Sequence, residues 1–523
     1  MIAPAELARL TQSSTPHALL DLREKAAYER GHIYRATSLP RRLLEFRLPT
    51  LVPARATPLV VCDEDGRLAA LALPTLGEMG YTDVRVLAGG LTAWRAEGRP
   101  LVEGINVASK VFGERALHEC KTPQLAPHEL WERIERGDDL VIVDTRTPEE
   151  YARGSLPGSW SVPGGELVLR IAELVRHPET TIVVHCGGRT RSYIGAESLR
   201  RMQLPNPVLA LENGTMGWEL AGLTLERGAA RWAPAPSARS RAVATLTAKR
   251  VAAEDGLAFI LPDDLAMRLA RRERERNLYV LDVRTADEYA AGHIAGAVWA
   301  PGGQAVQATD EYVAVRAASI VLVCDGFARS VMTASWLRRM GFPDVAVLAG
   351  GLPAWTAAGG AVEREHPTVV PFGWEAARQR VARVAPGDLG TGLILSVDQS
   401  DAYARGHVPG ARWLCRSRLE WTIGTLAPER QAPIVVTCAD GVASTLAAAT
   451  LDRLGYTAVS VLEGGTRAWA DAGLAVEDGR TRLADEPDDV VLKPYERGRE
   501  AMERYLRWEA DLDQDGRSRS RLL

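Results

Sequence analysis

An ordered set of sequence marks recurs four times along the chain, and this repeat limits the folds that the chain can adopt. Each copy holds an apolar run, a tyrosine followed three residues later by a glycine, a second apolar run ending on a cysteine, and a Gly-x-x-x-Trp element. The marks include Cys62, Cys186, Cys324 and Cys438, with Trp94, Trp218, Trp355 and Trp469. Successive cysteines are 124, 138 and 114 residues apart, and successive tryptophans 124, 137 and 114. These intervals are too long for a solenoid and predict a string of small domains.

The first apolar run ends in an acid and a base in three of the four copies. These pairs are Asp21 with Arg23, Asp144 with Arg146, and Asp282 with Arg284. Repeat 4 has Ser396 and Asp398 in the corresponding places. Because the pair also occurs in repeats whose cysteine loops look poor for catalysis, we interpret it as a structural pair at a strand end. In repeat 2 it could also orient the wall of a site.

The segments between the marks alternate between strand and helix patterns. Runs such as VIVD and TIVVHC are short and β-rich, which is typical of buried parallel strands. Thr147–Glu150 has the pattern of a helix capping box with proline at the first helical position, and Thr285–Glu288 repeats the box. The sequence therefore predicts an α/β protein with four tandem domains, each a parallel sheet flanked by helices. In such sheets ligands bind at the carboxyl ends of strands, where the repeated cysteine stands.

The expected domain bounds follow from the marks and from the composition between them. The four repeats and the helical tail are placed at 1–103, 124–228, 260–364, 372–478 and 479–523. Residues 104–123 and 229–244 are interpreted as connectors. In the tail, one helical face carries Met502, Tyr505, Leu506 and Leu512. We expect this face to dock on repeat 4, and the last eight residues, GRSRSRLL, to fray.

Composition narrows the function classes. The net charge of the 523 residues is −4, which gives no electrostatic case for binding nucleic acid or an anionic membrane. No apolar stretch is long enough to span a bilayer, and the first residues do not resemble a secretory signal. Six cysteines without a CxxC pair argue against a disulfide scaffold, a zinc ribbon or a dithiol site. The expected compartment is a reducing cytoplasm.

The cysteine loops differ in charge, and charge decides which thiol can become a nucleophilic thiolate. A cysteine between a strand and a helix is surrounded by unpaired backbone N–H groups and by the positive end of the helix dipole. The loops that begin at Cys186, Cys324, Cys438 and Cys62 have formal charges of +2, 0, −1 and −2. Acids next to a thiol raise its pKa and repel anions. The predicted order of reactivity is therefore Cys186, then Cys324, then Cys438 and Cys62, whose favoured interpretation is buried core.

The combined marks resemble the rhodanese (sulfurtransferase) domain. The matching features are Asp-x-Arg, Tyr-x-x-Gly-His-Ile, the cysteine loop before a helix, and Leu-x-Gly-Gly-x-x-x-Trp, which together cover roughly residues 1–478. The resemblance implies a parallel sheet flanked by helices. It also implies an enzyme whose cysteine takes a sulfane sulfur from a donor as a persulfide and passes it to an acceptor. The loop sequences of the best-known thiosulfate and mercaptopyruvate enzymes differ from the repeat 2 loop, so the donor stays open.

On this resemblance, Cys186 is predicted to be the catalytic nucleophile of a thiosulfate-type sulfurtransferase. The predicted substrate-binding residues are Gly187, Gly188, Arg189, Thr190, Arg191 and Ser192, with Asp144 and Arg146 as possible supports and Cys324 as a possible secondary cysteine. Backbone amides of the loop would stabilise the sulfur, and Arg189 and Arg191 would bind a small anionic donor such as thiosulfate. The expected acceptor is a thiol, a protein or cyanide. No metal or organic cofactor, nucleic acid or membrane is expected.

Several alternatives stay open beside this prediction. The related phosphatase branch is disfavoured, because its loops place five residues between the cysteine and the arginine and this loop has four. A second hypothesis is a persulfide relay or an interaction scaffold, in which most repeats are not catalytic. His118, Cys120 and His128 form only a weak metal-ligand pattern.

Two further marks are predicted to be structural. The repeated tryptophans are expected to pack in the core. His32, His293 and His407 recur after the glycine mark, but repeat 2 has Ser155 there. A catalytic histidine should not be missing from the best site, so these histidines are interpreted as hydrogen-bonded structural groups.

Overall fold

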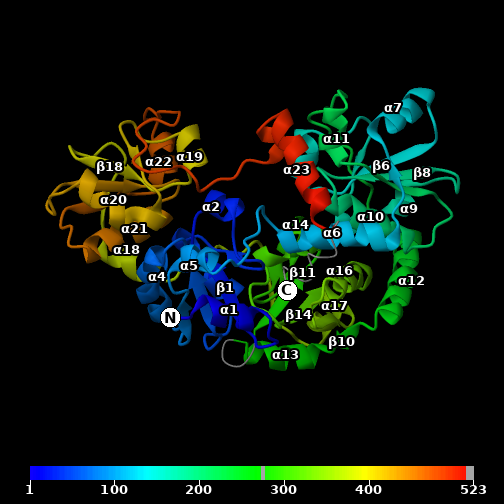
Figure 1. The fold of residues 1–523 in the computed structure, drawn as a ribbon, viewed down its shortest axis with the longest axis horizontal. Helices are drawn as coiled ribbons and strands as arrows, with labels where there is room; N and C mark the ends of the chain where they lie inside the picture. Colours follow the sequence, from blue (N-terminus) through cyan, green and yellow to red (C-terminus); the bar gives the residue numbers. More distant parts are fainter. Residues whose placement is uncertain (273–276, 514–523) are drawn as a thin grey trace. The chain divides into compact units, whose positions relative to one another are not determined.

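A computed structural model describes residues 1–272 and 277–513, and these residues form two compact units (Figure 1). Repeats 1 and 4 form unit 1, which consists of Met1–Thr11, Ala18–Ile105 and Thr368–Val491. Repeats 2 and 3 form unit 2 together with the helical tail, and this unit consists of Gln12–His17, Asn106–Pro367 and Leu492–Leu523. Within the described ranges, no helix is both long and apolar enough to cross a membrane. The eight residues predicted to fray lie outside the described residues.

Each repeat builds one parallel sheet, which confirms the predicted fold class. In unit 1 the sheet of repeat 1 has the spatial strand order β2 (Thr37–Ser38), β1 (Ala18–Asp21), β3 (Leu59–Cys62) and β4 (Val84–Val86). The sheet of repeat 4 has the order β17 (Ala382–Val384), β21 (Val459–Leu462), β20 (Ile434–Thr437), β18 (Leu393–Ser396) and β19 (Arg412–Trp413). In unit 2 the sheet of repeat 2 has the order β5 (Gln124–Leu125), β9 (Val208–Leu211), β8 (Thr181–His185), β6 (Leu140–Asp144) and β7 (Trp160–Ser161). The sheet of repeat 3 has the order β10 (Ala258–Ile260), β15 (Asp344–Leu348), β14 (Ser319–Val323), β11 (Leu278–Asp282) and β13 (Val298–Trp299). A small antiparallel pair, β12 (His293–Ile294) with β16 (Val362–Glu363), completes repeat 3.

Helices connect the strands in each repeat (Figure 1). In unit 1 they are α1 (Pro4–Thr11), α2 (Lys25–Arg30), η1 (Arg41–Leu43), α3 (Leu44–Leu51), α4 (Arg67–Glu78), α5 (Gly90–Ala96), α18 (Trp374–Arg380), α19 (Ser400–Arg405), η4 (Arg416–Arg418), α20 (Leu419–Leu426), α21 (Val442–Arg453) and α22 (Gly465–Asp471). In unit 2 they are α6 (Val107–Cys120), α7 (Pro127–Arg136), α8 (Pro148–Arg153), η2 (Gly164–Glu166), α9 (Leu167–Leu174), α10 (Thr190–Arg200), α11 (Gly214–Leu220), α12 (Ala238–Glu254), α13 (Pro262–Ala270), α14 (Ala286–Ala291), α15 (Gly302–Gln307), η3 (Thr309–Glu311), α16 (Ala328–Arg339), α17 (Gly351–Ala357), η5 (Pro494–Glu496) and α23 (Arg499–Asp511). The two predicted capping boxes are both formed, at Thr147 and Thr285.

Both segments interpreted as connectors contain long helices. The segment 104–123 holds α6, which packs along α10, and 229–244 leads into α12, which packs between α9 and α16. The buried face of α6 includes Lys110 and Glu114 as well as apolar residues, so its sequence lacks a clear amphipathic pattern. For α12 the sequence does contain a helix-start signal, which is the serine at position 237. In the structure the Ser237 hydroxyl caps the helix by accepting a hydrogen bond from the Ser240 N–H.

The acid–base pair braces the strand end in the three repeats that have it. In repeat 2, Arg146 donates from Nε and Nη2 to the two carboxylate oxygens of Asp144, at 3.0 and 2.7 Å, and from Nη2 to the carbonyl of Gly154 at 2.5 Å. Repeats 1 and 3 repeat the same three bonds. The pair therefore ties the strand end to the glycine mark wherever it occurs.

The repeated tryptophans also have a shared structural role. Trp218 is fully buried, and its indole Nε1 donates to the carbonyl six residues later, at Thr224, over 3.1 Å. The other three tryptophans make the same bond to the carbonyls of Pro100, Ala361 and Ala475. Each one thus holds the chain that leaves its last helix.

In repeat 2 the buried histidine comes from a different position in the repeat. In repeats 1, 3 and 4, a histidine after the glycine mark donates from Nδ1 to a tyrosine carbonyl and stacks on that tyrosine. Repeat 2 has Ser155 there, and a buried histidine, His185, comes instead from the end of β8. The Ser155 hydroxyl lies 3.5 Å from His185 Nε2 and 2.6 Å from Asp144 Oδ2. Burial lowers the pKa of His185 to about 4, so the ring is neutral at neutral pH.

Repeats 1 and 4 pair through reciprocal ion pairs. Arg41 donates to both carboxylate oxygens of Glu420, and Arg416 donates to both oxygens of Glu45. Arg41 and Arg416 each begin the short helix η1 or η4, and each glutamate follows its arginine by four residues. This exchange of equivalent contacts is the pattern of a two-fold interface between related domains.

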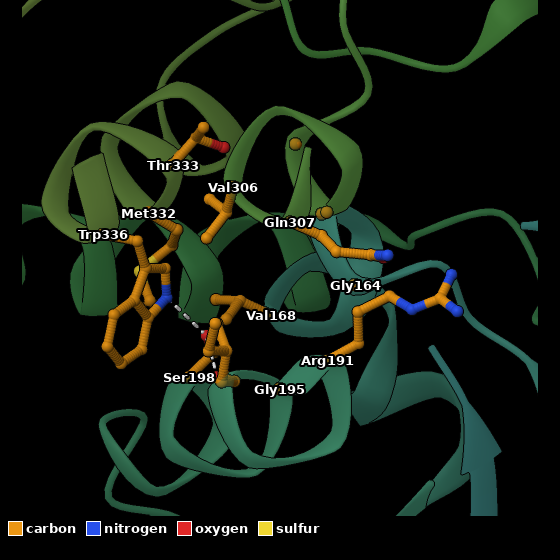
Figure 2. A pocket seen from close by; sticks show the side chains of 14 residues that line it. Gly164, Val168, Arg191, Gly195, Ser198, Val306, Gln307, Met332, Thr333 and Trp336 are labelled. Atoms are coloured by element: carbon orange, nitrogen blue, oxygen red, sulfur yellow. Dashed lines mark hydrogen bonds between the residues drawn. The ribbon is translucent and has the colours of Figure 1, made fainter. Parts of the chain in front are cut away.

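Repeats 2 and 3 pair through the same place in the repeat, but with glycines. A Cβ added to Gly165 would lie 3.0 Å from both Cα and N of Gly302, and one added to Gly303 would lie 3.2 Å from N of Gly164. Beside this backbone contact is a cavity of about 40 Å³, which Figure 2 shows with Arg191, Gln307 and Trp336 on its walls. That volume suits a water molecule or two and no substrate.

The glycine contact makes the pairing of repeats 2 and 3 sensitive to one methyl group. Gly165→Ala should lower the free energy of unfolding of unit 2 by about 1–3 kcal/mol, because the backbone on the other side cannot rotate away. Gly326→Ala is the matched control, since a Cβ there has no heavy atom within 4 Å. Urea unfolding of both variants checks this, and equal stabilities would contradict the proposed contact.

The buried His185 should make stability depend on pH. Its folded pKa of about 4 lies below the unfolded value near 6.5, so protonation favours the unfolded chain. The stability is complete above pH 6.5 and should fall by up to about 3 kcal/mol as the pH drops to about 4. His185→Val, with the residue that repeat 3 has there, should lose this component. Denaturant unfolding between pH 7.5 and 4.5 measures it, and parallel pH profiles for the two proteins would refute the assignment.

Candidate active site

Cys186 lies at the carboxyl end of β8, where the sequence predicts it. Gly187–Arg189 form the loop after it, and α10 begins at Thr190. The thiol is 2% exposed and donates a long hydrogen bond of 3.6 Å to the hydroxyl of Ser192. The loop therefore places one buried thiol directly beneath the first turn of a helix.

The carbonyls of the loop are turned away from the thiol. The Cys186 carbonyl accepts from the N–H of Thr215 at 2.8 Å, and the Gly187 carbonyl accepts from the N–H of Met216 at 3.1 Å. Gly214, just before these donors, has a φ of +54°, and a Cβ there would lie 2.3 Å from the Cys186 carbonyl oxygen. Only glycine permits this approach, which explains the glycine of the Gly-x-x-x-Trp mark.

The N–H groups of the loop remain available. From Gly187 to Ser192, none of them has a hydrogen-bond acceptor within the described part of the chain. They stand at the positive end of α10, an 11-residue helix. Such a group of amides can stabilise a thiolate, a persulfide or the charge of a bound anion.

Both arginines of the loop are bonded to carboxylates. Arg189 donates from Nε and Nη2 to Glu114 at 2.8 and 2.7 Å, and from Nη1 to Asn213 at 3.0 Å. Arg191 donates to both oxygens of Glu150 at 2.6 and 2.9 Å. Burial alone would raise the pKa of Glu150, but Arg191 lowers it to about 2. The formal charge of +2 expected from the loop sequence is thus balanced by groups outside it.

Two of these partners were missed as site residues. Glu114 is fully buried on α6, in the segment interpreted as a connector, and nothing in its local sequence indicates the arginine across from it. Glu150 is recognisable as a capping residue, and it serves both the cap of α8 and Arg191. A buried acid opposite a loop arginine would become evident only with the three-dimensional contacts.

Repeat 1 corrects the assumption that its cysteine occupies the loop position. The strand pairing places Asp21 opposite Cys62, whereas in repeat 2 the residue opposite Asp144 is His185. Asp63 therefore takes the place of Cys186, and its carboxylate accepts from the N–H groups of Gly66 and Leu68 at 2.5 Å each. Burial raises the pKa of Cys62 well above its usual value. The shift by one residue was not visible in the sequence because both apolar runs end on cysteine.

Repeat 4 also uses its own carboxylates to occupy loop amides. Asp398 accepts from the N–H of Ala439 at 2.9 Å, and Asp440 accepts from the N–H of Val442 at 3.0 Å. Burial raises the pKa of the Cys438 thiol. Here the loop that could stabilise a thiolate is already bonded to two acids.

Repeat 3 keeps a cysteine in the loop position but surrounds its arginine with acids. Arg329 contacts Glu166, Glu288 and Asp325 at 2.8, 2.6 and 2.7 Å. Arg191, the equivalent residue of repeat 2, has the single carboxylate partner Glu150 among the described residues. Burial raises the pKa of Cys324. Repeat 2 therefore differs from repeats 1 and 4 in that no carboxylate is bonded to its loop amides in the described residues, and from repeat 3 in that Arg191 has one carboxylate partner where Arg329 has three.

The helical tail does not dock on repeat 4. Helix α23 packs on α11 of repeat 2 through Met502, Leu506 and Met216. The two helices, red and green, lie side by side in Figure 1. The position of Met216 is Arg467 in repeat 4, and that of Leu220 is Asp471, so the two apolar side chains that α11 offers to α23 are charged in α22. This comparison between repeats was available in the sequence and points to repeat 2.

The weak metal-ligand pattern is not assembled. His118 lies 3.4 Å from the carboxylate of Asp513 through Nδ1. Across residues 1–272 and 277–513, no group of three or more histidines, cysteines and acids is arranged to hold a metal ion.

Comparison with known proteins agrees with this geometry. A solved structure of a thiosulfate sulfurtransferase from Pseudomonas aeruginosa is 39% identical, with a TM-score of 0.92, and the match covers 100% of this chain and 99% of that one. A thiosulfate sulfurtransferase from Azotobacter vinelandii is 32% identical over 242 residues, which cover 38% of this chain and 88% of the relative. A sulfurtransferase from Allochromatium vinosum is 30% identical over 96 residues, which cover 18% of this chain and 87% of the relative.

The family comparison accounts for all four repeats. The family model of the rhodanese-like domain matches residues 3–97, 126–221, 262–358 and 382–472. Together with the four parallel sheets and the cysteine loops, this match shows that the chain belongs to the rhodanese-like sulfurtransferase family.

Proposed function

We propose that this protein transfers a sulfane sulfur from a small anionic donor, such as thiosulfate, to a thiol or cyanide through a persulfide on Cys186. The observation that carries the proposal is the repeat 2 loop, which begins at a buried thiol and whose amides have no acceptor among the described residues. Repeat 1 supports the reading of these amides as an anion site, because the same loop position there holds the carboxylate of Asp63 bonded to backbone N–H groups. The names of the relatives favour thiosulfate as the donor.

The proposed reaction has two steps of nucleophilic displacement at sulfur. The Cys186 thiolate attacks the outer sulfur of thiosulfate, a new S–S bond forms, and the old S–S bond breaks as its electron pair leaves with sulfite. The persulfide anion that remains on Cys186 is stabilised by the N–H groups from Gly187 to Ser192. A thiolate or cyanide then attacks the outer sulfur and restores the Cys186 thiolate. No electrons are gained or lost overall.

The roles of the side chains follow from their partners. Arg189 and Arg191 hold the loop through their bonds to Glu114 and Glu150. Their positive charge, partly balanced by these carboxylates, is proposed to attract the anionic donor. Asp144 and Arg146 support the strand end behind the loop. Repeats 1, 3 and 4, within the bounds 1–103, 260–364 and 372–478, are proposed to be structural partners of the working repeat 2 at 124–228. Six free cysteines fit a reducing compartment such as the cytoplasm.

Mass spectrometry of the intact protein tests the proposal. After brief exposure to thiosulfate, the wild type should gain one sulfur (about 32 Da), and cyanide should remove it. Cys186→Ser should gain none, because the attacking sulfur is absent. Cys324→Ser is the matched control and should behave as the wild type, since burial raises the pKa of that thiol.

Other outcomes separate the alternatives. A second sulfur that survives in Cys186→Ser would favour a relay between cysteines. The absence of any sulfur with thiosulfate and with mercaptopyruvate would contradict an enzyme of this type and favour a scaffold.

A further inference from the structure

A carboxylate of the helical tail lies against the Cys186 loop. Glu509 on α23 is 1% exposed, and its Oε1 accepts from the Thr190 hydroxyl at 2.7 Å. Its other oxygen, Oε2, would lie 3.2 Å from a Cβ at Gly188. This oxygen is buried and has no hydrogen-bond partner in the described residues. An acid is therefore aimed at the loop whose amides are proposed to hold an anion.

Among the described residues, no arginine, lysine or histidine forms a salt bridge with Glu509. Arg189, which lies within electrostatic range of Glu509, is bonded through three nitrogens to Glu114 and Asn213. Arg191 is bonded to Glu150. Lys110 of α6 places its ammonium over the rings of Tyr505 and Trp508, at 5.1 and 5.0 Å from their centroids.

The phenol of Tyr505 interacts electrostatically with the Glu509 carboxylate. Burial raises the pKa of Tyr505 well above its usual value, and the carboxylate of Glu509 and the sulfur of Cys186 raise it further. Tyr505 thus lies within electrostatic range of both groups. The tail helix brings a negative charge and the reacting sulfur into one buried region, where like charges repel more strongly than in water.

We propose that Glu509 determines the charge specificity of the Cys186 site: its carboxylate disfavours anionic reactants, and thiosulfate reaches the sulfur only against this repulsion. The inference rests on the proposed function in one respect, which is that Cys186 is the reacting group. A carboxylate so placed would favour sulfane donors of lower negative charge, such as persulfides, over free dianions as donors to the resting enzyme. The sequence marks alone gave no indication of this, because Glu509 lies outside the four repeats.

Two alkylating reagents of similar size and different charge test the proposal without sulfur transfer. Iodoacetate is an anion and iodoacetamide is neutral, and the ratio of their rate constants at Cys186, identified by peptide mapping, measures charge selectivity. In Glu509→Gln this ratio of iodoacetate to iodoacetamide should rise about threefold to tenfold, because one buried negative charge is removed. Glu503→Gln is the matched control, because Glu503 lies on the same helix and pairs with Arg499, and its ratio should equal that of the wild type.

A structural effect gives a different result. If the substitution only loosens α23, both rate constants rise together and the ratio stays constant, which would overturn the proposal. Glu509→Ala provides a second variant, and it should raise the ratio in the same direction. An unchanged ratio in both variants also overturns the proposal.

Steady-state kinetics connect the inference to the reaction. Glu509→Gln should lower the KM for thiosulfate severalfold, with a smaller change in kcat. If the wild type forms no persulfide with thiosulfate, the donor in the proposed function is wrong, but the reagent ratio still decides the role of Glu509. If the persulfide forms and the ratio does not change, the function stands and the role of Glu509 is refuted.

Discussion

Each repeat depends on one hydrogen bond, which joins the carbonyl at the loop position to the N–H of the second residue in the helix that carries the Gly-x-x-x-Trp mark. Thr215 donates it to Cys186, and the equivalent donors are Leu91, Leu352 and Thr466. Because this bond turns the carbonyl outward, the following N–H groups are left to face the side chain at the loop position. The close approach requires a glycine before the donor. The requirement for glycine and the orientation of the loop N–H groups are thus two consequences of one contact.

The four repeats share this frame and differ in what occupies it. Repeat 1 places a carboxylate where repeat 2 has a thiol, and repeat 4 turns two acids onto its amides. Repeat 3 retains the thiol and adds acids around Arg329. Under the proposed function, side-chain substitution at one loop of a shared parallel sheet would separate a reactive domain from three structural ones.

The sequence predicted the fold and the place of Cys186 between a strand and a helix, because strand, loop and helix are local patterns that recur. It did not predict the partners of Arg189 and Arg191, because Glu114 and Glu150 meet them only through tertiary packing. The strand register of repeat 1 was wrong by one residue, since an apolar run ending in Cys-Asp fits either alignment. The predicted docking of α23 on repeat 4 was wrong, because the apolar face of α23 does not by itself show which repeat offers a matching apolar helix.

The pairing of the repeats has a consequence for synthesis of the chain. Repeat 1 is made first, but its partner is repeat 4, so the stretch that forms unit 2 is made between two halves of unit 1. Repeats 2 and 3 are neighbours in sequence and can pair as soon as both have left the ribosome, whereas repeat 1 must wait for the last repeat. Helix α23 follows repeat 4, and a nascent chain therefore presents Cys186 without its covering helix until translation has passed residue 511.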